Sequence, residues 1–124
     1  MLKLNLMPDQ LAVCRLPPDT PLPAWLGSGW HSITRTAEEL SIVCEAAHVP
    51  AAVQCEKPWR AFVVQGPLDF SEVGILASLS WALADARISL FAVSTFDTDY
   101  LLVRAGEVEA AVQALATVAD VEVP

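Results

Sequence analysis

Apolar residues in the second half of the chain recur every four positions, which is the spacing of an amphipathic helix. Ile75, Leu79 and Leu83 form this apolar stripe, and Ser71 is the predicted N-cap of the helix. Gly74 is unusual near the helix start, because a glycine inside a helix costs about 1 kcal/mol relative to alanine. It either lets a ligand approach the free N–H groups of the helix start or serves helix–sheet packing alone.

The pattern then changes to that of two strands joined by an acidic turn. Residues 88–95 and 100–103 are rich in β-branched and aromatic residues, which favour strands. Between them, residues 96–99 contain aspartate and threonine, which favour turns by bonding to their own backbone. This tip is either an ordinary solvated turn or a carboxylate site for an ammonium or guanidinium group.

Residues 61–123 as a whole predict the order β-α-β-β-α-β. A strand at 61–65 precedes the helix, and a second helix at 107–115 and a last strand at 120–123 follow the hairpin. This order is that of the split βαβ, or ferredoxin-like, unit. The predicted fold class is therefore α+β, with an antiparallel sheet covered on one face by two helices.

The first half of the chain has strand patterns but no long helix. Strands are predicted at 11–16, 30–36 and 40–45, and the four prolines between residues 17 and 23 exclude a long regular helix there. Residues 55–60 are predicted to form a polar junction between the two halves.

Two hairpins in the chain have similar patterns. Residues 34–43 align without gaps to residues 94–103, a shift of 60 positions that places Glu39 opposite Asp99. Such self-similarity indicates an internal repeat, whose first copy has lost its first helix to the proline-rich segment.

The repeat divides the chain into a degenerate module over residues 1–60 and a complete module over residues 61–124. In the complete module, both alternating sets of side chains along residues 88–95 are largely apolar, which predicts a strand buried on both faces. One layer of helices covers one face only. We therefore expect the other face, or the sheet edge, to meet the first module or a second copy in a homodimer.

Composition argues against several classes of partner. The chain has 124 residues, of which 54% are hydrophobic, enough for a real core. The net charge of −8 argues against binding nucleic acid or an anionic membrane through a basic surface. No apolar run reaches the roughly 18 residues of a membrane span. The N-terminus lacks the pattern of a secretory signal, so we expect a cytoplasmic protein.

No pattern indicates catalysis, a cofactor or a metal ion. The sequence has no G-x-S-x-G, P-loop or dinucleotide glycine motif. Cys14, Cys44 and Cys55 form no C-x-x-C pair, so we expect buried free thiols in a reducing compartment. His31 and His48 lack the spacing of a zinc site. We predict no catalytic residue, metal or cofactor; a small enzyme whose catalytic groups assemble only in space is an alternative.

The motif Glu72-Val73-Gly74-Ile75-Leu76, followed by residues 94–100, resembles ACT domains. It is most similar to those of the CASTOR-type amino-acid sensors and their small bacterial relatives, and residues 36–44 resemble the same bacterial proteins. The resemblance extends from about residue 11 to about residue 115. It implies ferredoxin-like ACT modules in tandem that bind a free amino acid where two modules meet.

The resemblance also implies where the amino acid binds. The backbone near Gly74 and Ile75 is expected to hold the ligand carboxylate, and Glu72 or Asp99 its ammonium group or a cationic side chain. The remaining expected ligand-binding residues are Val73, Thr95 and Phe96. The acidic site and the CASTOR-type resemblance both point toward arginine or another cationic amino acid. A dimerisation or protein–protein interaction module without a small ligand is the other alternative to this regulatory or sensor function.

Overall fold

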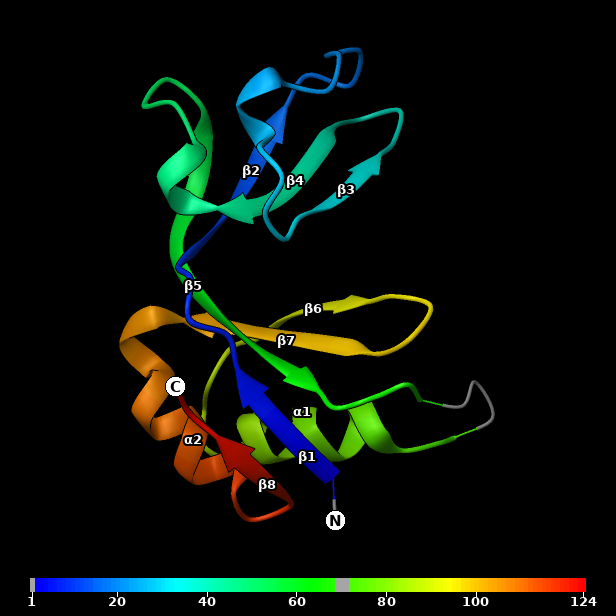
Figure 1. The fold of residues 1–124 in the computed structure, drawn as a ribbon, viewed down its shortest axis with the longest axis vertical. Coiled ribbons are helices and arrows are strands. Elements are labelled where there is room, and N and C mark those ends of the chain that lie inside the picture. Colours follow the sequence, from blue (N-terminus) through cyan, green and yellow to red (C-terminus); the bar gives the residue numbers. More distant parts are fainter. Residues whose placement is uncertain (1, 69–71) are drawn as a thin grey trace. The chain divides into compact units, whose positions relative to one another are not determined.

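The computed structural model describes residues 2–68 and 72–124 and contains two compact units (Figure 1). The larger unit consists of residues 1–8 and 60–124, and the smaller unit consists of residues 9–59. One boundary between the units therefore lies between residues 59 and 60. Residues 1–8, which the sequence pattern grouped with the first module, lie instead in the larger unit.

The larger unit follows the predicted β-α-β-β-α-β order with one strand added. Its sheet has the order β6-β7-β5-β1-β8. Its elements are β1 (Leu2–Leu6), the second part of β5 (Gln54–Val64), α1 (Ile75–Asp85), β6 (Phe91–Ser94), β7 (Asp99–Arg104), α2 (Val108–Leu115) and β8 (Ala119–Glu122). A 3-10 turn at Ala105–Glu107 precedes α2.

The added strand, β1, separates the first and last strands of the predicted unit. Leu4 pairs with Val64 of β5 in an antiparallel ladder and with Val121 of β8 in a parallel one. Leu4 and Leu6 are buried, because alternate residues of a strand face the same side. This strand supplies two leucines to the core of the larger unit, which explains why it belongs there.

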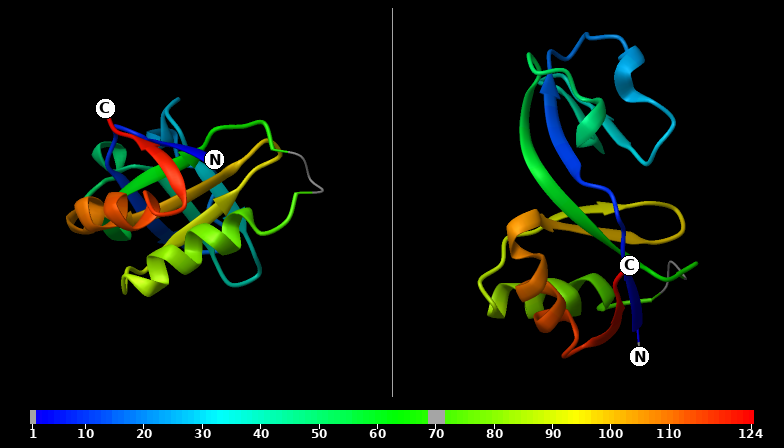
Figure 2. Two further views of the ribbon diagram at one scale, coloured as in Figure 1. Left: turned by 90° about the horizontal axis from the view of Figure 1, so that it is seen from below. Right: turned by 60° about the vertical axis from the view of Figure 1, so that its left-hand side comes forward.

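Both helices of the larger unit cover the same face of its sheet (Figure 2). The strand residues of the core alternate along each strand and therefore share one face, whereas Ala61 and Leu102, which are also buried, lie on the other face. The strand residues of the shared face and the helix residues that pack on them form one core: Leu4, Leu6, Phe62, Val64, Leu101 and Val103 from strands, and Leu79, Leu83, Ala111 and Leu115 from helices. The predicted α+β architecture is confirmed. Among the described residues, neither helix is long and apolar enough to cross a membrane.

The smaller unit is a sheet with short 3-10 turns in place of helices. Its strands are β2 (Leu11–Leu16), β3 (Ser32–Arg35), β4 (Leu40–Glu45) and the first part of β5, in the order β3-β4-β2-β5. The 3-10 turns are Ala24–Leu26 and Ala46–His48. Its core consists of Ala12, Cys14, Leu26, Leu40, Ile42, Cys44 and Val49.

Strand β5 replaces the predicted polar junction. It runs without a break over Gln54–Val64, so residues 55–60 are strand rather than loop. Its first part pairs with β2 and its second part with β1. The sequence pattern missed the first part because it contains charged and polar residues on both faces, without the alternation typical of a half-buried strand.

Helix α1 and strand β6 are shorter than predicted. The predicted cap, Ser71, lies outside the described residues, and the helix that the structure shows begins after Gly74. Strand β6 covers four residues, in which half-buried Phe91 and Val93 alternate with exposed Ala92. The prediction that this strand is buried on both faces is therefore wrong for the single chain.

The two hairpins do correspond, at a shift of 59 positions rather than 60. Arg35 pairs with Leu40 in the first, and Ser94 pairs with Asp99 in the second. The same backbone bond closes both turns, from a threonine N–H to the carbonyl three residues later: Thr36 to Glu39 and Thr95 to Thr98. The gapless alignment was wrong by one position, so the residue equivalent to Asp99 is Leu40 and not Glu39.

Gly74 is required by its backbone conformation and not by close packing. Its φ is +81°, in the left-handed region, and a Cβ added there would have no atom within 4 Å. Gly106 has equal space around it but no positive φ. The alternative that Gly74 serves helix–sheet packing alone is therefore wrong.

This difference predicts the outcome of a matched pair of substitutions. Gly74→Ala should lower the free energy of unfolding by about 1–2 kcal/mol, because a side chain in the left-handed region is strained. Gly106→Ala should leave it unchanged or raise it slightly, because alanine restricts the unfolded chain. Urea denaturation followed by circular dichroism measures both. Equal stability of the two variants would show that the conformation of Gly74 carries no strain for alanine.

Candidate ligand-binding site

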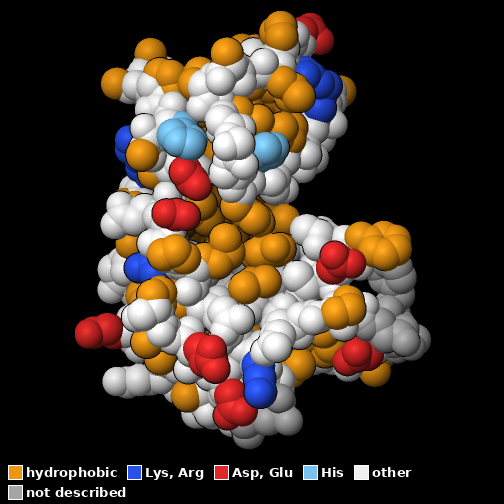
Figure 3. Space-filling model, in the orientation of Figure 1, with side chains coloured by type: hydrophobic (Ala, Val, Ile, Leu, Met, Phe, Trp, Pro, Cys, Tyr) orange, Lys and Arg blue, Asp and Glu red, His pale blue; other side chains and the backbone are white. Residues whose placement is uncertain are grey.

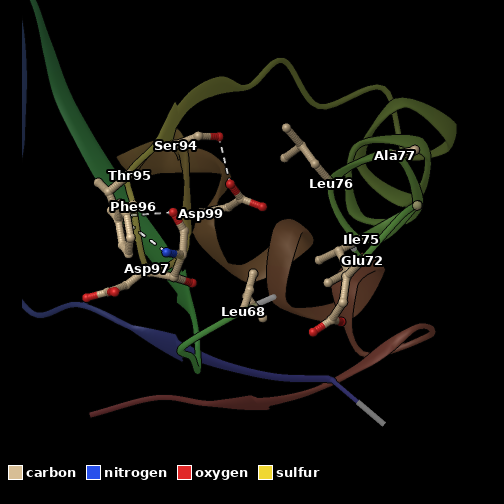
Figure 4. A pocket seen from close by; sticks show the side chains of 12 residues that line it. Leu68, Glu72, Ile75, Leu76, Ala77, Ser94, Thr95, Phe96, Asp97 and Asp99 are labelled. Carbon is tan, nitrogen blue, oxygen red and sulfur yellow. Dashed lines mark hydrogen bonds between the residues drawn. The ribbon is translucent and has the colours of Figure 1, made fainter. Parts of the chain in front are cut away.

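A cavity of about 300 Å³ lies in the larger unit, between the start of α1 and the tip of the β6–β7 hairpin (Figure 4). This volume is at the small end of the range for ligand pockets. The helix side contributes Glu72, Gly74, Ile75, Leu76 and Ala77, and the hairpin side contributes residues 94–99. Leu68, which precedes the helix, completes the lining.

The helix wall of the cavity presents backbone N–H groups. Gly74 is the N-cap residue of α1 and makes no side-chain cap. Its carbonyl accepts a hydrogen bond from the Ser78 N–H at 2.9 Å, which begins the helical ladder. The N–H groups of the first turn have no partner within the helix, and the helix dipole adds a partial positive charge there. This wall is therefore suited to an anionic group such as a carboxylate.

The hairpin wall presents an oriented carboxylate. The Ser94 hydroxyl donates to Asp99 Oδ1 at 2.6 Å, which fixes the rotation of the aspartate. Asp99 alternates with Leu101 and Val103 along β7, so it lies on the sheet face that the helices cover. Figure 4 shows its carboxylate pointing toward the helix side, whereas Asp97 in the turn points away. The hairpin thus sets one carboxylate opposite the helix start.

Two hydrogen bonds and one close approach hold the hairpin tip against the end of β5 and the residues that follow it. The Leu68 N–H donates to the Asp97 carbonyl at 2.7 Å, and the Thr98 hydroxyl donates to the Val64 carbonyl at 2.5 Å. Gly66 lies so close that an added Cβ would be 3.0 Å from the Asp97 carbonyl oxygen. The position of the hairpin wall is therefore set by bonds outside the hairpin as well as by its own turn.

The cavity is acidic. Its lining contains the carboxylates of Glu72, Asp97 and Asp99, and no lysine, arginine or histidine of the described residues lines it. Acidic side chains are also spread over the visible face of the larger unit (Figure 3), in keeping with the net charge of −8. An anion therefore meets favourable charge only at the helix wall, whereas a cationic group is attracted by the rest of the lining.

The structure brings six of the seven predicted ligand-binding residues to this cavity: Glu72, Gly74, Ile75, Thr95, Phe96 and Asp99. Val73 is 90% exposed and does not line it. The prediction missed Ser94, Asp97, Thr98, Leu76 and Ala77, which adjoin the predicted residues, and Leu68. Of these residues, only Leu68 lies more than two positions from every predicted site residue in the sequence. It is held at the cavity by its backbone hydrogen bond to Asp97 in the hairpin.

The described residues do not suggest a metal centre. No group of three or more histidine, cysteine, aspartate or glutamate side chains among them is arranged to hold a metal ion.

Comparisons with solved structures give relatives at different distances. A protein of Agrobacterium tumefaciens is 38% identical, with a TM-score of 0.93 over 99% of this chain and 93% of that one. A Vibrio cholerae protein of unknown function is 22% identical, with a TM-score of 0.78 over 94% and 88%. The regulatory subunit of aspartate kinase from Thermus flavus shares the fold at 12% identity, with a TM-score of 0.64 over 92% and 95%. No curated protein matches the chain.

Two family models match the sequence. One describes an N-terminal domain and matches residues 9–52, which lie within the smaller unit. The other describes the ACT domain and matches residues 54–117, which include β5, both helices and the cavity. These matches do not test the narrower resemblance to CASTOR-type sensors, which stays a prediction. Since the ACT model covers just over half of the sequence, the chain belongs to the ACT-domain family.

Proposed function

We propose that this protein binds a free amino acid in the cavity of its larger unit and acts as a regulatory or sensor module. The observation that carries the proposal is the pairing of two opposite walls. An uncapped helix start faces the carboxylate of Asp99, which Ser94 orients. An amino acid carries a carboxylate and an ammonium group a few atoms apart, so it needs both kinds of wall in one small cavity.

The charges of the cavity define how the ligand lies. Its carboxylate binds the N–H groups at Gly74 and Ile75, and its ammonium group binds Asp99. Hydrogen bonds to charged groups of this kind contribute roughly 1.5–3 kcal/mol each. Glu72 also lines the cavity and adds a second carboxylate to it. This excess of carboxylates favours arginine or another cationic amino acid over a neutral one.

A regulatory role fits the site better than catalysis. The lining contains no histidine or cysteine among the described residues, so the Ser–His and Cys–His pairs of nucleophilic catalysis are not found there. The fold is shared with regulatory subunits of aspartate kinase, which lends support by analogy of fold. The proposal places the protein in the cytoplasm, a reducing compartment in which free cysteines are usual.

We also propose that the protein forms a homodimer through strand β6. Among the described strands, β6 pairs with β7 alone, so it is an edge strand of the sheet, the kind of strand that can pair with a second copy. Exposed Ala92 on this strand, and the nearby exposed Phe96, add apolar surface. Light scattering at high micromolar concentration should give the mass of two chains; the mass of one chain would count against the dimer.

Ligand binding is tested first with the carboxylate of Asp99. A thermal-shift screen of free amino acids identifies the ligand, because a ligand that binds only the folded state raises the melting temperature. In isothermal titration, Asp99→Asn should weaken affinity about 10-fold or more through the lost charge. Asp120→Asn makes the same chemical change at an exposed position of β8 and should bind as wild type does. Equal affinity of wild type and Asp99→Asn would rule out this site.

A second prediction concerns the position of the hairpin wall. Gly66→Ala places a Cβ about 3.0 Å from the Asp97 carbonyl, so the tip must move. We expect affinity to fall about 3- to 10-fold, a loss of roughly 0.7–1.4 kcal/mol, with the circular dichroism spectrum unchanged. Gly106→Ala, which meets no atom within 4 Å, is the matched control. Unchanged affinity in Gly66→Ala would mean that the hairpin tip does not contact the ligand.

A further inference from the structure

The smaller unit gathers all three cysteines of the chain in one core. Cys14 on β2 lies directly opposite Cys55 on β5 in the antiparallel ladder. Cys44 lies on β4, the other neighbour of β2, where it pairs with Ala12. The thiol of Cys14 lies near enough to those of Cys44 and Cys55 for both to affect its pKa. Cys14 and Cys44 belong to the core of this unit, and Cys55 packs against it.

The ladder positions distinguish between the two neighbours of Cys14. Directly opposed residues in an antiparallel pair have Cα atoms about 4.5–5.5 Å apart. Disulfides need Cα atoms roughly 4.4–6.8 Å apart, so Cys14 and Cys55 meet this requirement without moving the backbone. Cys44 is offset from Cys14 by two residues, and such diagonal neighbours are about 7–8 Å apart. The direct pair is therefore the one suited to a covalent link.

The three thiols also differ in their access to solvent. Cys14 and Cys44 are 1% and 0% exposed, whereas Cys55 is partly exposed. We propose that Cys14 and Cys55 form a reversible cross-strand disulfide. Cys55 reacts first with the oxidant, and Cys14 then attacks the mixed disulfide at Cys55. This proposal concerns the smaller unit and does not depend on the amino-acid site.

The reaction is a thiol–disulfide exchange with a small disulfide, RSSR. The Cys55 thiolate attacks one sulfur of RSSR, forms a mixed disulfide and releases RS⁻, which takes up the proton that Cys55 lost. The Cys14 sulfur then attacks the Cys55 sulfur, and the second RS⁻ leaves with the proton of Cys14. Overall, RSSR gains two electrons and two protons and becomes two RSH, while the protein gains one S–S bond.

The local environment makes this reaction slow at neutral pH. Burial raises the pKa of the Cys55 thiol above its ordinary value, and the charges of Cys14 and Glu56 act in the same direction, whereas Lys57 lowers it. The thiolate fraction therefore grows with pH over the neutral range. The rate of exchange should rise about 10-fold per pH unit there, since only the thiolate attacks.

The test uses the full chain and glutathione disulfide at pH 8, followed by acid quenching and alkylation of free thiols. Trypsin with a glutamate-specific protease separates the three cysteines, because Glu45 and Glu56 directly follow Cys44 and Cys55. Mass spectrometry of the unreduced digest should show a Cys14–Cys55 link within one chain. The link should disappear on treatment with dithiothreitol and should form about 10-fold more slowly at pH 7.

Two variants test which cysteines form the link. Cys44→Ala should still form the link, whereas Cys55→Ser should form no disulfide within the chain. Because the linked residues lie 41 positions apart, the oxidised wild type should also melt several degrees higher than the reduced protein. A glutathione adduct alone, a Cys14–Cys44 link, or a disulfide only between two chains would each overturn the proposal. The mapping on wild type decides it even if a variant fails to fold.

Discussion

Burial of one sheet face in the larger unit is the constraint on which the geometry of the cavity depends. Leu79 and Leu83 are fully buried on this face, so α1 cannot slide along the strands without opening the core. Leu101 of β7 is buried on the same face. Since Ile75 is one turn before Leu79, and Asp99 is two residues before Leu101, the same packing fixes both walls. The cavity therefore lies where α1 and β7 begin, just before the first residues of each that are buried in the core.

The start of α1 lacks the stabilising side-chain cap that many helices have at their N-terminus. A serine or aspartate at the N-cap would bond the first-turn N–H groups with its own side chain, and such caps contribute about 1 kcal/mol. Gly74 makes no such bond and holds a left-handed conformation. A side-chain cap would compete with a ligand carboxylate for the same donors. Departures from local rules are expected at functional sites, and this one coincides with the cavity.

Periodicity in the sequence predicted the elements that bury one face, and it failed where burial or chain order is unusual. The stripe of α1 and the strands of both hairpins were predicted, and most of the residues that line the cavity lie in or beside the two short motifs of the sequence. Strand β1 was missed although its pattern, L-K-L-N-L, alternates, because nothing local shows that Leu4 pairs with residues 60 and 117 positions further along the chain. The shift between the hairpins was wrong by one because the apolar runs 42–44 and 101–103 overlap at either alignment.

The corrected shift shows that the smaller unit lacks a residue equivalent to Asp99. Leu40 stands where the larger unit has Asp99, and it is fully buried in the core of the smaller unit. A carboxylate there would lose its hydration without a partner, which is strongly unfavourable. The residues that precede this hairpin form a 3-10 turn at Ala24–Leu26 in place of an α-helix, so the N–H cluster is missing as well. The smaller unit has a hairpin of the same form but neither the helix wall nor the carboxylate wall. Leucine, isoleucine and cysteine side chains lie in its core.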